Sequence, residues 1–507
     1  MSDIRHPDPS TTAALRADLA AAGYTAAAVR AAWGPLADDA IGRGLLAPAR
    51  RALAGRSDAL AVLCRTLFLG DTAPAADLDR ALPTAGVAGL VTLGIVRVEG
   101  GTATPLVLLR PQDYTDAAGS GWWWIVSDLD EAALGGALPT GHVLGVGGAS
   151  LTLAGLQLDT PARRVLDVGT GCGIQALRAQ RSASSVVATD VSERALRFTL
   201  LNAALNDVDG IEVRHGSLFE PVAGEKFDRV VSNPPFVITP RVAGVPEYEY
   251  RDAGFAGDDL VAAFVSGVGG VLAPGGTAQL LGNWEYREGQ DGLDRVREWV
   301  AASAHPLDAW IVEREQLDPL AYAELWVRDG GTAPGSPDYA RLIDAWLADF
   351  AARGVTAVGF GYLLLRRTPI GMPPLARYER VTQPVPGALG PHLGAALAAW
   401  DRLGLLDDDG LAEATAVVAS DVTEARHHRP GAEEPSVIEL RQGAGFGRVL
   451  NVDPALAALV GACDGDLPLG VLIDAIADLL EVDAAALRAD LLPRVRELAF
   501  TGFLRVV

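Results

Sequence analysis

The feature that most constrains this chain is the segment VLDVGTGCG at residues 165–173. An apolar strand here ends at Asp167. Three glycines then follow at alternate positions: Gly169, Gly171 and Gly173. Such glycines let the chain turn sharply from a strand into a helix and let a ligand touch the backbone. A dinucleotide-binding loop would need glycine at the next position, so the bulky Ile174 argues against a pyrophosphate ligand.

The sequence around this segment alternates between strands and helices. Short apolar strands (VVATD, RVVSNPPF and AQLLG) are separated by amphipathic helices. The stretch VTAVGFGYLLLRR, residues 355–367, is typical of a last antiparallel strand pair. This pattern predicts an α/β fold with a doubly wound, mostly parallel sheet.

A chain of 507 residues is long enough for two to four domains. Residues 1–142 predict helices followed by a short hairpin, an α+β unit similar to a winged helix. The sheet domain is expected over residues 143–368, and the Pro- and Gly-rich residues 369–390 are expected to be a linker. Residues 391–507 predict a second winged-helix-like unit of helices and a terminal strand.

Three adjacent indoles, Trp122, Trp123 and Trp124, stand in the predicted strand SGWWWIVSD. They could form a stacking platform for a ligand. We favour a strand buried on both faces, because aromatic residues serve most often as core.

The composition excludes several classes of protein. A formal net charge of -22 disfavours binding to long stretches of nucleic acid, which calls for a basic field. The three cysteines, Cys64, Cys172 and Cys463, are far apart and form no metal-binding or disulfide pattern. Since no signal core or run of about 18 apolar residues occurs, we expect a soluble, cytoplasmic protein without a membrane or metal partner.

A carboxylate stands at the end of the next predicted strand, SVVATD. This is Asp190, about 20 residues after the glycines, where it can accept two hydrogen bonds from a ribose diol. The third strand is followed by GSLFEP, in which Ser217 and Leu218 could flank an adenine. A nucleoside-containing cofactor is indicated by these three features together: the glycine loop, the acidic residue at the strand end and the loop after the third strand.

These motifs resemble those of the class I S-adenosylmethionine-dependent methyltransferases, over about 220 residues. The resemblance implies a Rossmann-like, seven-stranded sheet with S-adenosyl-L-methionine as the cofactor. It implies that Asp167 contacts the methionine amino group, and that Thr170 and Val191 complete the cofactor site. Ser150 and Thr152, in a segment that could close over the cofactor, are weaker candidates.

The segment VVSNPPFVITP, residues 230–240, carries the chemistry. It resembles the Asn-Pro-Pro-aromatic motif of enzymes that methylate planar NH2 groups. Such a nitrogen is a poor nucleophile because its lone pair is delocalised, so the site must accept both N–H bonds. Here the Asn233 side chain and the Pro234 carbonyl can accept them, Pro235 stiffens the loop, and Phe236 can stack on the flat group. Orientation and preorganised acceptors would supply the catalysis, and no thiol is needed, so Cys172 is expected to be a bystander.

Two further strings bear on the substrate. NPPFVITP and RDAGFAGDDL, residues 251–260, resemble segments of release-factor glutamine methyltransferases. The core also resembles ribosomal-RNA guanine methyltransferases, which use NPPF. We favour a glutamine side-chain amide in a protein, with an amino group of an RNA base as the alternative and a non-catalytic cofactor-binding scaffold as a third hypothesis. Asn283 and Trp284 could line the pocket or be structural.

Overall fold

The structure is a computed structural model that describes residues 4–136, 138–242, 244–245 and 254–507. It contains two compact units, each described by itself. Unit 1 comprises Met1–Ala154 and Pro161–Arg367, and unit 2 comprises Gly155–Thr160 and Thr368–Val507.

The N-terminal part of unit 1 is built from short helices and a small antiparallel sheet of order β1-β3-β2. The helical segments are α1 (Pro9–Ala21), α2 (Ala26–Trp33), α3 (Pro35–Ile41), α4 (Ala47–Ala52), α5 (Ala59–Leu63), the π-helix η1 (Cys64–Phe68), α6 (Ala75–Ala81), α7 (Gly86–Thr92) and α8 (Glu131–Leu134). The strands are β1 (Ala73–Pro74), β2 (Val96–Glu99), β3 (Thr102–Pro105) and the long hairpin β4 (Val107–Asp116) and β5 (Gly119–Asp128). A turn at Gly100–Gly101 joins β2 to β3, with both glycines at positive φ.

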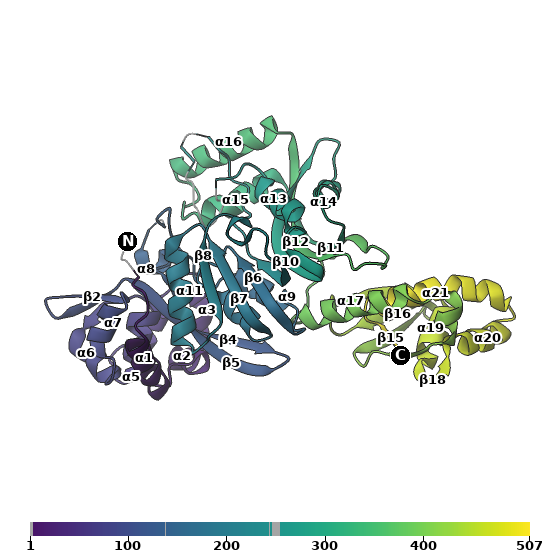
Figure 1. The fold of residues 1–507 in the computed structure, drawn as a ribbon, viewed down its shortest axis with the longest axis horizontal. Helices are drawn as coiled ribbons and strands as arrows, with labels where there is room; N and C mark the ends of the chain where they lie inside the picture. The colour runs from purple at the N-terminus through teal and green to yellow at the C-terminus, as the bar shows by residue number, and fades with distance from the viewer. Residues whose placement is uncertain (1–3, 137, 243, 246–253) are drawn as a thin grey trace. The chain divides into compact units, whose positions relative to one another are not determined.

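The central sheet of unit 1 has the spatial order β11-β12-β10-β9-β6-β7-β8 (Figure 1). Strands β6 to β10 pair in parallel, and β12 runs antiparallel to both β10 and β11. The strands are β6 (Ala162–Val168), β7 (Ala183–Asp190), β8 (Ile211–His215), β9 (Phe227–Ser232), β10 (Leu272–Arg287), β11 (Leu307–Leu317) and β12 (Val355–Arg367). The predicted doubly wound, Rossmann-like α/β sheet is therefore confirmed.

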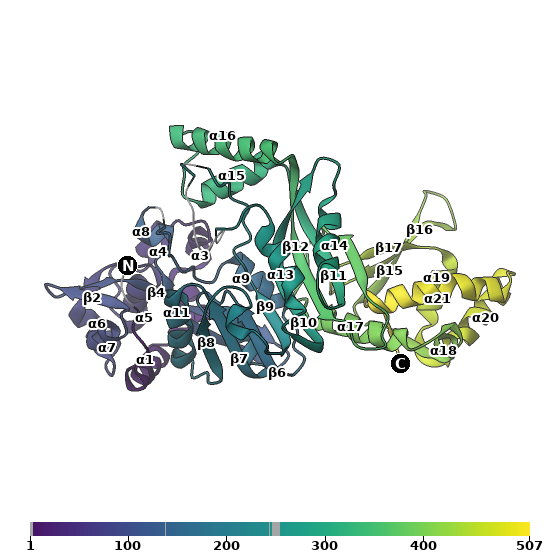
Figure 2. The same ribbon diagram turned by 45° about the horizontal axis from the view of Figure 1, so that its top comes forward.

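Helices connect these strands, as a mostly parallel sheet requires. They are α9 (Gly148–Leu156), α10 (Ile174–Gln180), α11 (Glu193–Leu205), η2 (Glu220–Val222), α13 (Asp259–Val268), α14 (Gly292–Ala301), α15 (Pro319–Asp329) and α16 (Pro337–Ala352). The last two lie side by side and are inserted between β11 and β12 (Figure 2).

The N-terminal part and the sheet domain share one hydrophobic core. Buried side chains of the N-terminal helices, such as Leu15 and Leu67, belong to the same cluster as Leu177 of α10 and Phe198 of α11. Trp123 and Trp124 of the hairpin lie in this core, and Trp124 donates its indole N–H to the carbonyl of Tyr24 at 2.7 Å. The expectation of buried indoles holds for these two, whereas Trp122 is 44% exposed.

Two asparagines, Asn202 of α11 and Asn206 directly after it, take the place of a neighbouring strand along the edge of β5. The Asn202 amide bonds both the N–H and the carbonyl of Val126, at 2.7 and 2.9 Å, and also the carbonyl of Cys172 at 2.8 Å. Asn206, one turn later, bonds the N–H and the carbonyl of Trp124 in the same way, at 2.8 and 2.9 Å. These bonds satisfy backbone groups that would otherwise be buried without partners, and they fix the hairpin against the sheet domain.

Unit 2 combines helices with two small antiparallel sheets, of order β18-β14-β19 and β15-β16-β17. Its elements are β13 (Ala376–Arg380), α17 (Gly390–Gly404), α18 (Asp408–Glu413), β14 (Thr415–Val418), β15 (Val422–His428), β16 (Pro435–Gln442), β17 (Val449–Val452), α19 (Pro454–Ala462), β18 (Asp464–Pro468), α20 (Leu469–Leu480), α21 (Ala484–Phe500) and β19 (Leu504–Val506). The winged-helix likeness of the flanking units stays a prediction.

The expected linker, residues 369–390, differs from a plain connection. It contains β13, and Glu379 of that strand accepts hydrogen bonds from Arg377 and Arg448. Proline and glycine residues surround this strand, so the sequence pattern did not predict it. Within the described part of the chain, no helix combines the length and apolar character that a membrane span requires.

The Asn202 bonds should contribute strongly to the stability of unit 1. Asn202→Leu keeps the number of side-chain heavy atoms but leaves three buried backbone groups without partners, each costing about 1–3 kcal/mol. We expect a free energy of unfolding lower by about 3 kcal/mol in denaturant titrations. Asn451→Leu on the exposed side of β17 is the control and should change it by less than about 0.5 kcal/mol. Equal midpoints for both variants would contradict the assignment.

Candidate active site

The polar loops identified in the sequence leave the sheet at one edge. Strand order reverses between β6 and β9, since the chain moves from β6 outward to β7 and β8 and then returns to β9. Ligands of open α/β sheets bind at such a switch point, at the carboxyl ends of the strands. Val168 pairs with both Thr189 and Ser232, so the residues that follow these strands emerge side by side.

The glycine loop after β6 has the conformation that its composition predicts. Gly169, Gly171 and Gly173 have φ of 72°, 56° and 82°, values that only glycine adopts without strain. A Cβ on Gly173 would lie 3.0 Å from Thr199 of α11. Ile174 begins α10 and is buried, which explains an apolar residue at that position.

Asp167 lies beneath this loop and is fully buried. Its Oδ2 accepts a hydrogen bond from the Thr170 hydroxyl at 2.7 Å, whereas its Oδ1 has no hydrogen-bond partner among the described residues. Burial raises the pKa of this carboxyl to about 7, with a smaller contribution from the charge of Asp190. A buried acceptor that the protein leaves unsatisfied fits an ammonium group arriving with a ligand.

Asp190 occupies the end of β7 and lines the same cavity as the glycine loop. Its carboxylate accepts the Gly171 N–H at 3.0 Å and the Ser192 N–H at 2.8 Å. These two bonds fix the orientation of the carboxylate at the wall of the cavity.

The loop after β8 adds a strained backbone position. Leu218 has a φ of 46°, an uncommon conformation for a residue with a branched side chain. It lines the cavity together with Gly216 and Ser217, and Val191 lies on the same wall while 52% exposed. Such strain is found most often at functional sites.

The NPPF segment follows β9 directly. Ser232 donates its hydroxyl proton to the Val168 carbonyl at 2.7 Å, which ties the start of this loop to the end of β6. The Oδ1 of Asn233 is buried and has no hydrogen-bond partner among the described residues. Phe236 packs against Phe360 with ring centroids 5.6 Å apart. Asn233 therefore combines an unsatisfied amide oxygen with a position on the wall of the cavity described next.

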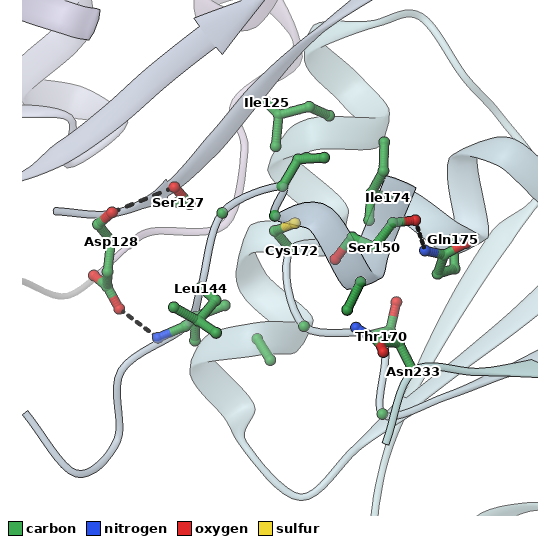
Figure 3. A pocket seen from close by; sticks show the side chains of 18 of the residues that line it. Ile125, Ser127, Asp128, Leu144, Ser150, Thr170, Cys172, Ile174, Gln175 and Asn233 are labelled. Atoms are coloured by element: carbon green, nitrogen blue, oxygen red, sulfur yellow. Dashed lines mark hydrogen bonds between the residues drawn. The ribbon is translucent and has the colours of Figure 1, made fainter. Parts of the chain in front are cut away.

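A cavity of about 970 Å³ is lined by most of these groups, whereas Asp167 is not part of its described wall. Its wall includes Asn233, Pro234, Pro235 and Phe236 as well as the glycine loop and Asp190. Figure 3 shows Asn233 and Thr170 on one side of this space, and Ile125, Cys172 and Ile174 on another. Since small-molecule and cofactor pockets typically measure about 300–1,000 Å³, the cavity is large enough for a cofactor together with part of a substrate.

Much of this wall comes from residues that the sequence did not single out. They belong to the N-terminal helices, the hairpin and the inserted helix α15, and include Val29, Trp33, Phe68, Arg110, Ile125, Trp326 and Asp329. The apolar ones have the periodicity of ordinary core residues, so no local signal distinguishes them. The π-helical turn that ends at Phe68 is a local feature often associated with functional sites.

Several weaker candidates are now placed. Ser150 lines the cavity, and its carbonyl accepts a hydrogen bond from Gln175 at 2.7 Å, whereas Thr152 is not part of the described wall. Asn283 and Trp284 also lie off this wall. Trp284 donates its indole N–H to buried Glu313 at 2.8 Å, which makes it structural.

Cys172 lines the cavity, but its thiol is buried. Desolvation raises the pKa of this thiol to about 11. It therefore stays protonated near neutral pH and is a poor nucleophile.

The string RDAGFAGDDL has a structural role in its described part. Asp258 is buried and accepts the Glu285 N–H at 2.9 Å and a pair of bonds from Arg295, which joins α13, β10 and α14. Residues 251–253, including Ala253, lie outside the described residues. No cluster of three or more His, Cys, Asp or Glu side chains able to hold a metal occurs in the described ranges.

Comparison with known proteins gives three family matches. Residues 147–244 match the methyltransferase small domain. Residues 21–106 and 397–506 match two families described as domains of unknown function (DUF7059 and DUF7782).

Curated relatives are similar over part of this chain. The release factor glutamine methyltransferase of Xylella fastidiosa strain Temecula1 is 35% identical over 131 residues, which are 24% of this chain and 48% of that protein. The ribosomal protein L11 methyltransferase of Lactobacillus johnsonii is 40% identical over 101 residues, 19% of this chain and 32% of that protein. The chain thus spans at most about half the length of these curated relatives.

Among solved structures, the YcgJ protein of Bacillus subtilis is 15% identical, with a TM-score of 0.30 over 44% of this chain and 98% of that one. The family match covers the glycine loop, Asp190 and the NPPF segment. Residues 147–244 of the chain therefore resemble the methyltransferase small domain over the stretch that holds these motifs.

Proposed function

We propose that this protein transfers a methyl group from S-adenosylmethionine to the side-chain amide of a glutamine in a protein substrate. The observation that carries the proposal is the buried, unpartnered Oδ1 of Asn233, on the wall that also contains the glycine loop and Asp190. Such an oxygen can accept a hydrogen bond from an N–H of a bound substrate.

The residues present fit the cofactor at each end. The unpartnered Oδ1 of Asp167 suits the methionine ammonium, directly or through water, and Asp190 suits the ribose diol. The wall formed by Ser217 and Leu218 suits the adenine, with Thr170 and Val191 beside it. When bound, S-adenosylmethionine supplies a methyl group activated by its sulfonium.

The chain's own task is to orient the amide. Asn233 Oδ1 and the Pro234 carbonyl would each accept one N–H, which favours the pyramidal nitrogen that attacks. Phe236 would offer a flat face to the amide, and Pro235 limits the freedom of the loop. Orientation and fixed acceptors act mainly in the transition state, so they need no strong base.

A protein substrate is favoured over RNA by charge and by the relatives. A chain with a net charge of -22 repels a phosphate backbone. The relatives above are named for release factors and for ribosomal protein L11, which are proteins.

The test is transfer of tritiated methyl groups from S-adenosylmethionine to cell extract. Protease-sensitive label that appears as volatile methylamine after acid hydrolysis supports amide methylation. RNase-sensitive label would redirect the proposal to a base amino group. Cofactor binding without transfer to either fraction would support a binding scaffold. The labelled peptide then serves as the kinetic substrate.

Asp190→Ala should weaken cofactor binding. Loss of two hydrogen bonds to a carboxylate lowers the affinity by about 30-fold or more, measured by calorimetry. Glu193→Ala is the matched control, because Glu193 is an exposed carboxylate three residues later and does not line the cavity. Unchanged affinity in Asp190→Ala would remove Asp190 from the cofactor site.

Asn233→Ala should lower kcat by roughly 100- to 1000-fold, the effect of removing one preorganised polar partner. Cofactor affinity and melting temperature should barely change, since Asn233 is expected to face the substrate. Asn233→Asp retains an acceptor oxygen and should recover part of the rate. A purely structural Asn233 would instead lower stability and cofactor affinity while kcat per cofactor-bound enzyme is maintained.

Cys172→Ser should retain most of its activity, because the buried thiol stays protonated and methyl transfer to nitrogen needs no thiolate. The rate of methyl transfer is measured beside the circular dichroism spectrum. A loss of about 100-fold or more with the fold intact, the size expected for a catalytic group, would show that Cys172 takes part.

A further inference from the structure

The inserted helix α15 stands beside the NPPF loop and lies outside the matched methyltransferase segment, residues 147–244. It begins at Pro319 after Asp318, whose side chain accepts the Ala321 N–H at 2.8 Å. It packs on α16 and on β12. Its position is thus fixed by a capped start and by two neighbouring elements.

Tyr322 in the first turn of α15 is 3% exposed and anchored by aromatic neighbours. Its ring centroid lies 6.1 Å from that of Trp346 and 6.0 Å from that of Phe350, both on α16. The ring therefore has little freedom to move.

The Tyr322 hydroxyl connects the NPPF loop to the central sheet. It accepts the backbone N–H of Ile238 at 3.0 Å and the side-chain N–H of Asn283 at 2.5 Å. Asn283 belongs to β10, the strand next to β9. Both bonds are buried, so water does not compete for them.

The loop needs such a support. Residues 233–240 form neither helix nor strand, and three of them are prolines without a backbone N–H. The Ser232 hydroxyl fixes the start of the loop, and the Tyr322 hydroxyl fixes it five residues beyond Asn233. A displacement of about 1 Å can cost 100-fold in rate, so the support matters for an acceptor that must meet a specific N–H.

The same helix contributes to the cavity. Trp326 and Asp329 follow Tyr322 by one and two turns, on the same side of α15, and both line the wall that includes Phe236. A displacement of α15 would therefore move the loop support and this wall together.

We propose that Tyr322 is a positioning residue that holds the NPPF loop, and with it the Asn233 acceptor, in the reactive arrangement through the bonds to Ile238 and Asn283. This role rests on the proposed function of Asn233. Tyr322 itself touches neither substrate nor cofactor. Trp326 extends the arrangement as the adjoining wall of the substrate end.

The test compares Tyr322→Phe with Tyr286→Phe. The first removes the hydroxyl and leaves the ring. The second is a matched control on β10, because it removes a buried tyrosine hydroxyl that donates to Glu313 at 2.6 Å and does not line the cavity. Tyr322→Phe should lower kcat by about 10- to 100-fold with little change in KM or cofactor Kd. Tyr286→Phe should keep kcat within about threefold of wild type once it is folded.

Hydrogen–deuterium exchange of peptides spanning residues 232–240 supplies a readout that needs no substrate. Faster amide exchange of these peptides in Tyr322→Phe, and not in Tyr286→Phe, is the expected result if Tyr322 holds the loop. Equal exchange in the two variants, or equal kcat, overturns the positioning role. If the wild-type protein transfers no methyl group, the proposed function fails, and the exchange measurement still decides whether Tyr322 holds the loop.

Discussion

The parallel pairing of β6 with β9 is the interaction on which the site depends. It places the glycine loop and the NPPF loop at neighbouring strand ends, and the bond from Ser232 to the Val168 carbonyl fastens the two exits. The separation between the two loops is then set by backbone hydrogen bonds in the centre of a sheet. Such a base is more rigid than flexible side chains on a surface loop, and methyl transfer requires that precision.

The N-terminal part of unit 1 packs against the sheet domain and shares its hydrophobic core. Asn202 and Asn206 bind β5 as a strand would, and the shared core includes Leu177 and Phe198 beside the N-terminal helices. The hairpin thereby brings Ile125 to the cavity. The wall of the substrate end comes from this part and from α15, both largely outside the matched methyltransferase segment. Selection of a substrate would accordingly lie in the parts of the chain that differ from the shared core.

The sequence predicts those parts of the site that follow from strand ends. The sequence alone predicts that Asp190 and Asn233 lie near each other, because the carboxyl ends of parallel strands share one edge of the sheet. Tyr322 could not, since its bond to Ile238 joins residues 84 positions apart and a tyrosine in an amphipathic helix looks like core. The position of Trp33 on the cavity wall could not be predicted for the same reason. Its side chain is 6% exposed and has the spacing of a core residue, although it also lines the cavity. The strand β13 was hidden by the prolines and glycines around it.

Some of the buried polar groups that lack partners among the described residues lie at this edge of the sheet, and others lie elsewhere in both units. Buried acceptors without partners, such as Asp167 Oδ1 and Asn233 Oδ1, cost the fold about 1–3 kcal/mol each. The left-handed Leu218 adds about 1 kcal/mol or more. A sequence selected for stability alone would remove these costs, for example with an apolar side chain in place of Asn233. A ligand that offers hydrogen-bond donors to Asp167 Oδ1 and Asn233 Oδ1 would remove these two costs, and it would stabilise the folded unit in proportion to its binding.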